Sequence, residues 1–114
     1  MSSVDCLFCR IVSGEVPSSR VAESSLSLAF RDVNPAAPRH VLVIPKAHVA
    51  DSLAQLEDNE VLTDMMALVQ DVARSEGLEA GWRLVANVGP DGGQTVPHLH
   101  FHLLGGRKMT WPPG

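Results

Sequence analysis

The sequence lacks the features that direct a protein to nucleic acid or to a membrane. Its 114 residues carry a net charge of −4 and give a pI near 5.6, so the chain has no basic excess to neutralise nucleic-acid phosphates. No apolar run approaches the ~20 residues that a membrane-spanning helix needs. These absences argue against nucleic acid and against a membrane as partners.

Signals for secretion and for disulfides are equally scarce. The N-terminal stretch 1–5 lacks the positive n-region and the apolar h-region of a signal peptide. We therefore expect a cytoplasmic protein, in which thiols stay reduced. In that setting the two cysteines, Cys6 and Cys9, are better interpreted as metal ligands or buried thiols than as a disulfide.

The chain does have enough apolar residues to form one core. Its composition, 45% hydrophobic and 19% charged, is typical of a globular protein, and its length suits a single domain over residues 1–114. Residues 105–114 form a tail that is too rich in proline for a helix or a central strand.

Hydrophobic periodicity predicts an α+β fold with an antiparallel sheet of about five strands. Apolar residues recur at spacings of three and four between Asp58, a candidate N-cap, and Gly77, which stands where a helix C-terminus belongs. Glycine-rich connections replace the crossover helices that a parallel sheet needs. The expected elements are a short helix over 6–12, strands over 21–23, 26–30 and 40–45, this long helix, and strands over 82–88 and 96–104.

Three of the five histidines alternate with apolar residues in the last predicted strand. Successive side chains of a strand point to opposite faces, so His98, His100 and His102 should share one face. The apolar residues between them should pack on a core. Three imidazoles on one face of a strand favour a functional site over histidines that are merely packed or surface residues.

A glycine-rich loop precedes this strand and offers a place for an anion. Gly92 and Gly93 let backbone N–H groups approach a bound anion, and the hydroxyl of Thr95 adds a donor. A neutral imidazole beside such a cradle can act as a nucleophile toward phosphorus. A plain hairpin leading into a strand is the simpler interpretation of the loop taken alone.

A second interpretation of the histidines is a catalytic zinc site. His98, His100 and His102 would then hold the ion together, in a metal-dependent hydrolase. A straight strand fits the facial arrangement of three ligands poorly, which disfavours this hypothesis.

The sequence resembles the histidine triad (HIT) family, and within it the Hint branch. Segment 98–104 matches the motif His-x-His-x-His followed by two apolar residues. Segments 32–35, 38–46 and 87–95 and the ending Trp-Pro-Pro-Gly at 111–114 are similar to the Hint branch as well. Together these segments span nearly the whole chain.

The resemblance implies a HIT-like fold that pairs as a two-fold dimer and a nucleotidyl hydrolase that acts on purine nucleotides. Substrates would be nucleoside 5′-phosphoramidates or aminoacyl-adenylates, and the chemistry would require no metal. His100 would attack the α-phosphorus to form a nucleotidyl-histidine intermediate, His102 would bind a phosphate oxygen, and His40 would continue the hydrogen-bond relay. A dinucleoside polyphosphate hydrolase and a nucleotide-binding regulatory protein with weak catalysis remain alternatives.

The same resemblance implies a nucleotide-binding set. Asp32 would accept hydrogen bonds from the ribose hydroxyls, which suits the two oxygens of a carboxylate. Thr95 stands where a serine is common, and its added methyl bears on the fit of the leaving group. The apolar slot for the base would comprise Phe8, Ile11, Phe30 and Val33, and the contacts to the phosphate or leaving group Asn87, Gly93 and Thr95.

A Cys-x-x-Cys pair with distant histidines has the ligand types of a four-coordinate structural zinc site. The bacterial relatives that carry this pair imply His48 and His98 as partners of Cys6 and Cys9. A buried thiol pair is the alternative.

The tail carries the last expectation. Trp111 is costly to expose, and the resemblance implies that this tail packs near the active site of a two-fold partner. The alternative is a tail that folds over its own sheet.

Overall fold

The structure, a computed structural model, describes residues 5–114. Residues 1–4 lie outside this range, and so does most of the segment 1–5 on which the expectation of no signal peptide depends. The elements follow the predicted order, with one added turn of 3-10 helix. They are α1 (Leu7–Ser13), β1 (Arg20–Glu23), β2 (Ser27–Arg31), β3 (Arg39–Pro45), η2 (Leu53–Gln55), α2 (Asn59–Ser75), β4 (Trp82–Val85) and β5 (Phe101–Gly105).

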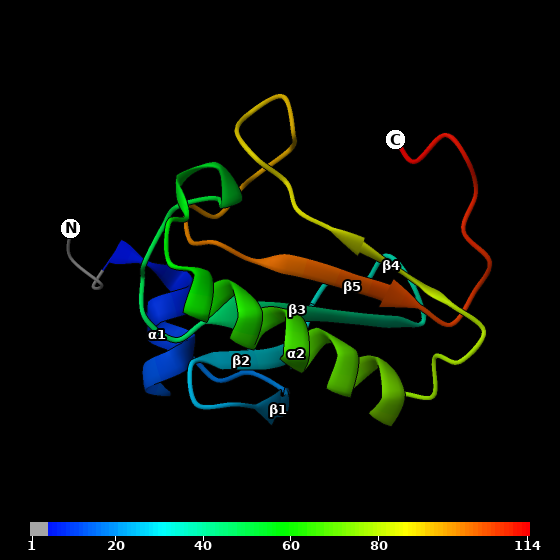
Figure 1. The fold of residues 1–114 in the computed structure, drawn as a ribbon, viewed down its shortest axis with the longest axis horizontal. Helices are drawn as coiled ribbons and strands as arrows, with labels where there is room; N and C mark the ends of the chain where they lie inside the picture. Colours follow the sequence, from blue (N-terminus) through cyan, green and yellow to red (C-terminus); the bar gives the residue numbers. More distant parts are fainter. Residues whose placement is uncertain (1–4) are drawn as a thin grey trace.

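The strands form one antiparallel sheet in the order β1-β2-β3-β5-β4, which confirms the α+β prediction (Figure 1). Helix α2 crosses one face of this sheet, and α1 packs against the other. The last strand in the sequence, β5, lies between β3 and β4, so the histidine segment enters the middle of the sheet. Leu42 of β3 stands directly opposite His102 of β5.

Helix α2 begins and ends where the sequence predicts, for identifiable reasons. The Asp58 carboxylate accepts the N–H groups of Glu60 and Val61, at 3.0 and 3.2 Å. Gly77 follows the last turn with φ of +72°, a conformation that glycine adopts without strain. The N–H of Leu78 then bonds back to the Ala73 carbonyl at 3.0 Å, as in a Schellman motif.

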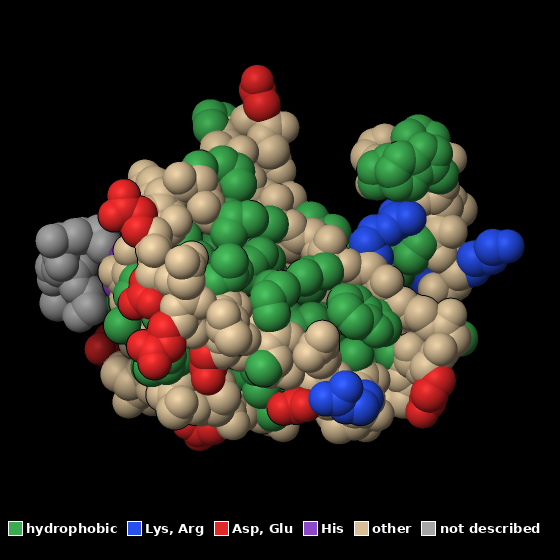
Figure 2. All heavy atoms as spheres, viewed as in Figure 1, with side chains coloured by type: hydrophobic (Ala, Val, Ile, Leu, Met, Phe, Trp, Pro, Cys, Tyr) green, Lys and Arg blue, Asp and Glu red, His purple; other side chains and the backbone are tan. Residues whose placement is uncertain are grey.

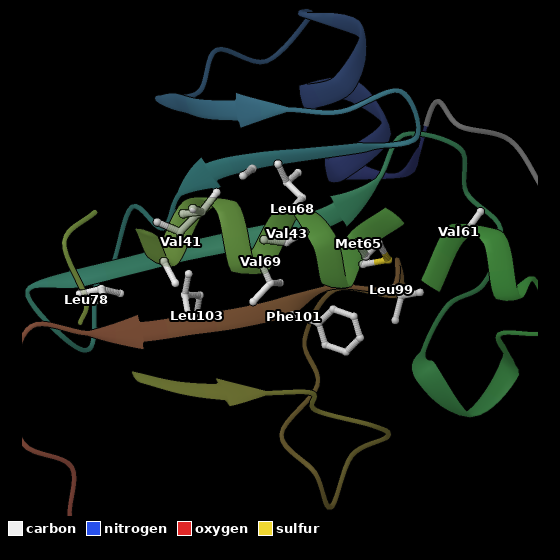
Figure 3. Packing of buried hydrophobic residues seen from close by; sticks show 13 residues of the cluster. Val41, Val43, Val61, Met65, Leu68, Val69, Leu78, Leu99, Phe101 and Leu103 are labelled. Atoms are coloured by element: carbon white, nitrogen blue, oxygen red, sulfur yellow. The ribbon is translucent and has the colours of Figure 1, made fainter. Parts of the chain in front are cut away.

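The two faces of the sheet carry separate apolar clusters. On one face α2 covers inward-pointing residues of β3 and β5, among them Val41, Val43, Phe101 and Leu103 (Figure 3). On the other face α1 packs Phe8 and Ile11 against side chains of β2 and β3. The cluster on the α1 side comprises Cys6, Phe8, Ile11, Leu28, Phe30, Leu42 and Ile44.

The predicted strand over 96–104 is too long at its start, because β5 begins only at Phe101. Pro97 has no N–H to give to a ladder. The N–H of Leu99 bonds to the carbonyl of Ala50 at 3.0 Å, away from the neighbouring strand. The chain therefore bends over 96–98, where the N–H of His98 bonds to the carbonyl of Val96 at 2.9 Å, and joins the sheet only at Phe101. The strand predicted over 82–88 is likewise shorter and ends at Val85.

The predicted alternation of faces nevertheless holds through the unpaired part. Leu99, Phe101 and Leu103 all belong to the cluster under α2. His98 and His100 turn to the opposite face, where both rings meet the ring of Phe8.

No helix within residues 5–114 is long and apolar enough to cross a membrane.

Candidate functional site

A cleft of about 370 Å³ opens beside α1 on the histidine face of the sheet. That volume falls in the range of small-molecule sites, and a mostly apolar wall with a few polar groups is typical of them. The polar residues on the wall are Ser18, Arg31, Asp32, Thr95, His100 and His102. The apolar residues are Leu7, Phe8, Ile11, Val16, Pro17, Phe30, Val33, Leu42 and Val96.

Most of the predicted nucleotide-binding residues meet at this cleft. Asn87 and Gly93 are absent from its lining; Asn87 is half-buried, and Gly93 lies exposed in the loop with φ of +79°. His40 stands behind His102, off the wall. The predicted residues that do line the cleft are Phe8, Ile11, Phe30, Asp32, Val33, Thr95, His100 and His102.

Sequence reasoning missed part of the wall. Leu42 could have been predicted, because the pairing of β3 with the histidine strand places it opposite His102. Arg31 has its guanidinium committed to Glu76 through two hydrogen bonds of 2.8 and 3.0 Å, which makes it a structural cation. That guanidinium holds the pKa of the Glu76 carboxyl below its ordinary value. The other missed residues are Leu7, Val16, Pro17, Ser18 and Val96.

His100 has one ring nitrogen in a hydrogen bond, and the other has no hydrogen-bond partner within residues 5–114. Its Nδ1 lies 2.8 Å from the carbonyl oxygen of His98. A carbonyl only accepts, so Nδ1 carries the proton and Nε2 keeps its lone pair. The Phe8 ring stands edge-on against the imidazole, with ring centroids 5.1 Å apart, and His100 is only 6% exposed. Packing and the hydrogen bond together fix this ring.

His40 and His102 form a relay with the opposite tautomer. The N–H of Ala36 donates to Nδ1 of His40 at 3.0 Å, so the proton of His40 must reside on Nε2. That nitrogen lies 2.9 Å from Nδ1 of His102. His102 therefore accepts through Nδ1 and carries its own proton on Nε2. This buried Nε2 has no hydrogen-bond partner among residues 5–114.

Burial keeps the relay neutral. It lowers the pKa of His102 to about 4, aided by repulsion from His100 and His40. Burial also lowers the pKa of His40, while the nearby Asp32 carboxylate opposes the shift. Asp32 Oδ2 lies 3.4 Å from His40 Nε2, and its Oδ1 accepts the N–H of Asn34 at 2.8 Å. At neutral pH His40 and His102 are thus uncharged imidazoles beside the Asp32 carboxylate.

Cys6, Cys9, His48 and His98 form a second cluster at the start of α1. Their ligand atoms all lie within 4.8 Å of one another. Nδ1 of His98 is 3.1 Å from Cys6 Sγ and 3.6 Å from Cys9 Sγ, and Nδ1 of His48 is 3.6 Å from Cys9 Sγ. Sulfur and nitrogen atoms on a tetrahedral zinc ion stand about 3.5 Å apart, given the usual metal–ligand bond lengths. The donor set and its spacing therefore fit zinc.

Both histidines of this cluster are oriented by their outer nitrogens. Nε2 of His98 donates to the carbonyl of Pro45 at 3.0 Å, and Nε2 of His48 donates to the Asp51 carboxylate at 2.7 Å. Their Nδ1 lone pairs therefore face the sulfur atoms, as metal ligands with supporting partners do. Burial lowers the pKa of His98 to about 4 and, with neighbouring Cys6, raises that of Cys9 to about 11. A metal would replace the thiol protons on binding.

The hypothesis of one zinc ion shared by His98, His100 and His102 meets the geometry poorly. Nδ1 of His98 points to Cys6, and Nδ1 of His100 is taken by a carbonyl. Within the described part of the chain, the other group of convergent ligand atoms is Asp32, His40 and His102. Its two histidines already share a hydrogen bond. The ring nitrogens of the three triad histidines thus do not converge on one point among the described residues.

Comparison with known proteins places the chain in a family. A model of the HIT domain matches residues 13–109, and the chain belongs to that family. It is 49% identical to a 14 kDa zinc-binding protein of Zea mays, over 95% of this chain and 87% of that protein. It is 46% identical to the adenylylsulfatase HINT1 of Arabidopsis thaliana, over 95% of this chain and 76% of that protein.

A solved structure agrees with this assignment. The crystal structure of a HIT family hydrolase from Legionella pneumophila Philadelphia 1 superimposes with a TM-score of 0.91 at 50% identity, covering 96% of this chain and 100% of that one. The HIT fold that the sequence predicts is thereby confirmed.

The lowered pKa of His102 predicts a dependence of stability on pH. Between its ordinary value of 6.5 and about 4, the unfolded chain binds a proton at His102 that the folded chain excludes. The free energy of unfolding should therefore fall with falling pH across this window, by up to about 1.4 kcal/mol per pH unit for one proton. Urea unfolding at pH 7 and pH 5 measures it. The His102→Gln variant should lose less stability than the wild type over that interval, and an equal loss would contradict the assignment.

Proposed function

We propose that this protein hydrolyses purine nucleoside 5′-phosphoramidates or aminoacyl-adenylates through a nucleotidyl intermediate on His100. The observation that carries the proposal is the complementary pair of tautomers at one cleft. His100 offers a nitrogen lone pair, and neighbouring His102 offers an N–H with no partner in the described chain. A nucleophile beside a donor for a phosphoryl oxygen is the minimum that displacement at phosphorus requires.

The cleft has a suitable place for each part of such a substrate. Phe8, Ile11, Phe30 and Val33 offer an apolar slot for a purine, and Val33 is 88% exposed at its rim. The carboxylate of Asp32 would accept the ribose hydroxyls. Those contacts would bring the α-phosphorus toward the two histidines. Thr95, together with Asn87 and Gly93 on the adjoining loop, would contact the phosphate or the leaving group.

The chemistry would proceed in two displacements. In the first, Nε2 of His100 bonds to the α-phosphorus as the bond to the leaving group breaks. The leaving group would be an amine that takes a proton from water, or the amino-acid carboxylate of an aminoacyl-adenylate. The N–H of His102 would bind a non-bridging oxygen as negative charge grows on it, and His40 would hold His102 in the donating tautomer. In the second, water displaces His100 from phosphorus and releases the nucleoside monophosphate. The names of the Legionella hydrolase and the Arabidopsis adenylylsulfatase support hydrolysis of a nucleotide.

We also propose that Cys6, Cys9, His48 and His98 hold a structural zinc ion. The fit of the ligand atoms supports it, as does the name of the zinc-binding relative from Zea mays. The ion would join α1 to the histidine segment. No chemical step above passes through it.

A homodimer would give the exposed aromatic residues a partner. Trp111 is 80% exposed, with the Arg83 guanidinium 6.0 Å from its ring centroid, and Trp82 on the outer strand β4 is 41% exposed. A hollow of about 690 Å³ lies between Trp82 and the tail. Hydrophobic side chains also gather over the α2 face (Figure 2).

Sedimentation at micromolar concentration tests the homodimer and should give twice the chain mass. The Trp111→Ala variant should associate more weakly, because it removes an exposed aromatic side chain. A monomeric mass for the wild type would contradict the dimer.

Loss of the nucleophile should abolish hydrolysis. We expect His100→Ala to lower kcat/KM for an adenosine phosphoramidate by at least about 10³-fold, because His102, the other imidazole on the cleft wall, presents an N–H and not a lone pair. The exposed helix variant Thr63→Ala serves as a matched control and should keep wild-type activity. Persistent hydrolysis in His100→Ala would contradict the mechanism.

The same assay separates the alternative functions. Run side by side, an adenosine phosphoramidate should be cleaved faster than a diadenosine polyphosphate. The reverse order would identify a dinucleoside polyphosphate hydrolase. Tight nucleotide binding with negligible turnover of both substrates would instead favour a regulatory protein.

Metal analysis tests the structural zinc. The purified protein should contain one zinc ion per chain, and Cys6→Ser should lose most of it. Binding to the folded state alone would stabilise the chain by about 4 kcal/mol at a thousandfold excess over the dissociation constant, so this variant should also unfold more easily. Protein that holds no zinc, with Cys6→Ser as stable as the wild type, would favour a buried thiol pair.

A further inference from the structure

The metal cluster and the cleft share His98. Its side chain faces Cys6 through Nδ1, at 3.1 Å, and its backbone carbonyl accepts the Nδ1–H of the His100 imidazole at 2.8 Å. His98 is fully buried, so its side chain cannot shift without its backbone following. One residue therefore ties a metal ligand to the proton that sets the tautomer of the nucleophile.

Helix α1 makes a second connection. Phe8 lies between the two cysteines in sequence and lines the cleft. Its ring contacts the imidazoles of both His98 and His100, with centroids 5.8 and 5.1 Å apart. A metal that fixes Cys6 and Cys9 would fix the wall of the base slot as well.

Gln94 makes the third connection. The Asp51 carboxylate accepts the Nε2–H of His48. The backbone carbonyl of Asp51 accepts an N–H from Nε2 of Gln94 at 2.6 Å. The same amide nitrogen donates to Val96, while its Oε1 accepts the N–H of Gly89 at 3.0 Å. Gln94 thus closes both ends of the loop that carries Thr95 and fastens that loop to the segment bearing His48.

We propose that occupancy of the metal site and binding of a nucleotide in the cleft are energetically coupled, with Gln94 and His98 as the positioning residues. This inference rests on the proposed function. Without a metal, the four ligand atoms meet one another only through sulfur–nitrogen contacts of 3.1 to 3.6 Å among the described residues. A metal fixes all four at once, and the three connections carry that order to the nucleophile, the base slot and the loop.

Coupling between two binding sites is reciprocal. If the metal tightens nucleotide binding by some factor, the nucleotide must tighten metal binding by the same factor. Couplings of this kind usually lie between about five- and 150-fold, and we expect about tenfold here. Metal affinity therefore gives a readout that does not depend on catalysis.

The test titrates zinc against a chromophoric chelator, with and without saturating adenosine 5′-monophosphate. In the wild type the nucleotide should lower the dissociation constant of zinc about tenfold, and it should slow transfer of zinc from the loaded protein to the chelator. In Gln94→Met the ratio should fall toward unity, with zinc affinity in the absence of nucleotide little changed. Gln70→Met, an exposed residue of α2, is the matched control and should keep the wild-type ratio.

The outcomes separate the inference from the function beneath it. Equal zinc affinity with and without a nucleotide that does bind overturns the coupling and leaves the proposed function standing. If Gln94→Met keeps the wild-type ratio of zinc dissociation constants, Gln94 does not carry the coupling. The same result is expected if the nucleotide tightens zinc binding only by stabilising the folded chain, so it overturns the role of Gln94 in that case too. Failure of the nucleotide to bind any form contradicts the nucleotide site and the coupling together.

Discussion

The hydrogen bond from Nδ1 of His100 to the carbonyl of His98 is the constraint on which the candidate site depends. It fixes the ring, and it forces the lone pair onto the nitrogen that is left for a substrate. Both residues precede β5, in a segment that bends at His98 and pairs with no strand. Pro97 and the bond from Leu99 to Ala50 produce that local departure from the sheet. A regular strand ladder through this segment would give the His98 carbonyl a competing backbone donor.

The relay through His40 and His102 extends the same logic to the second histidine. A backbone N–H at one end dictates every proton position along the relay, so His102 presents a donor without being charged. Burying an uncharged imidazole costs far less free energy than burying a cation. The lowered pKa values of His40 and His102 therefore follow from their burial and keep both rings neutral. Such a preset donor can stabilise growing charge on a phosphoryl oxygen without reorganising.

Much of this structure follows from local pattern. Three features could be predicted because each depends on near neighbours in sequence. They are the period of α2 with its end signals at Asp58 and Gly77, the order of the elements along the chain, and the alternation of histidines with apolar residues. The gathering of Cys6, Cys9, His48 and His98 followed from family resemblance, since spacing alone leaves a buried thiol pair open.

What the sequence could not reveal depends on contacts between distant segments. The shortening of the last strand comes from a bond to Ala50, and the role of Gln94 comes from its reach to Asp51. Val16, Pro17 and Ser18 join the cleft because the chain leaving α1 passes along it, which no local motif signals. Asn87 and Gly93 were predicted in the site but lie off the cleft wall, because a family motif does not specify how the loop is held.

The central claim is that the two neighbouring imidazoles are held in opposite tautomers. Long-range ¹H–¹⁵N correlation spectra of the protein at neutral pH measure this directly, with His100→Ala and His102→Gln used to assign the rings. We expect His100 to carry its proton on Nδ1, and His40 and His102 to carry theirs on Nε2. A proton on Nε2 of His100, or a protonated imidazolium at His102, would contradict it.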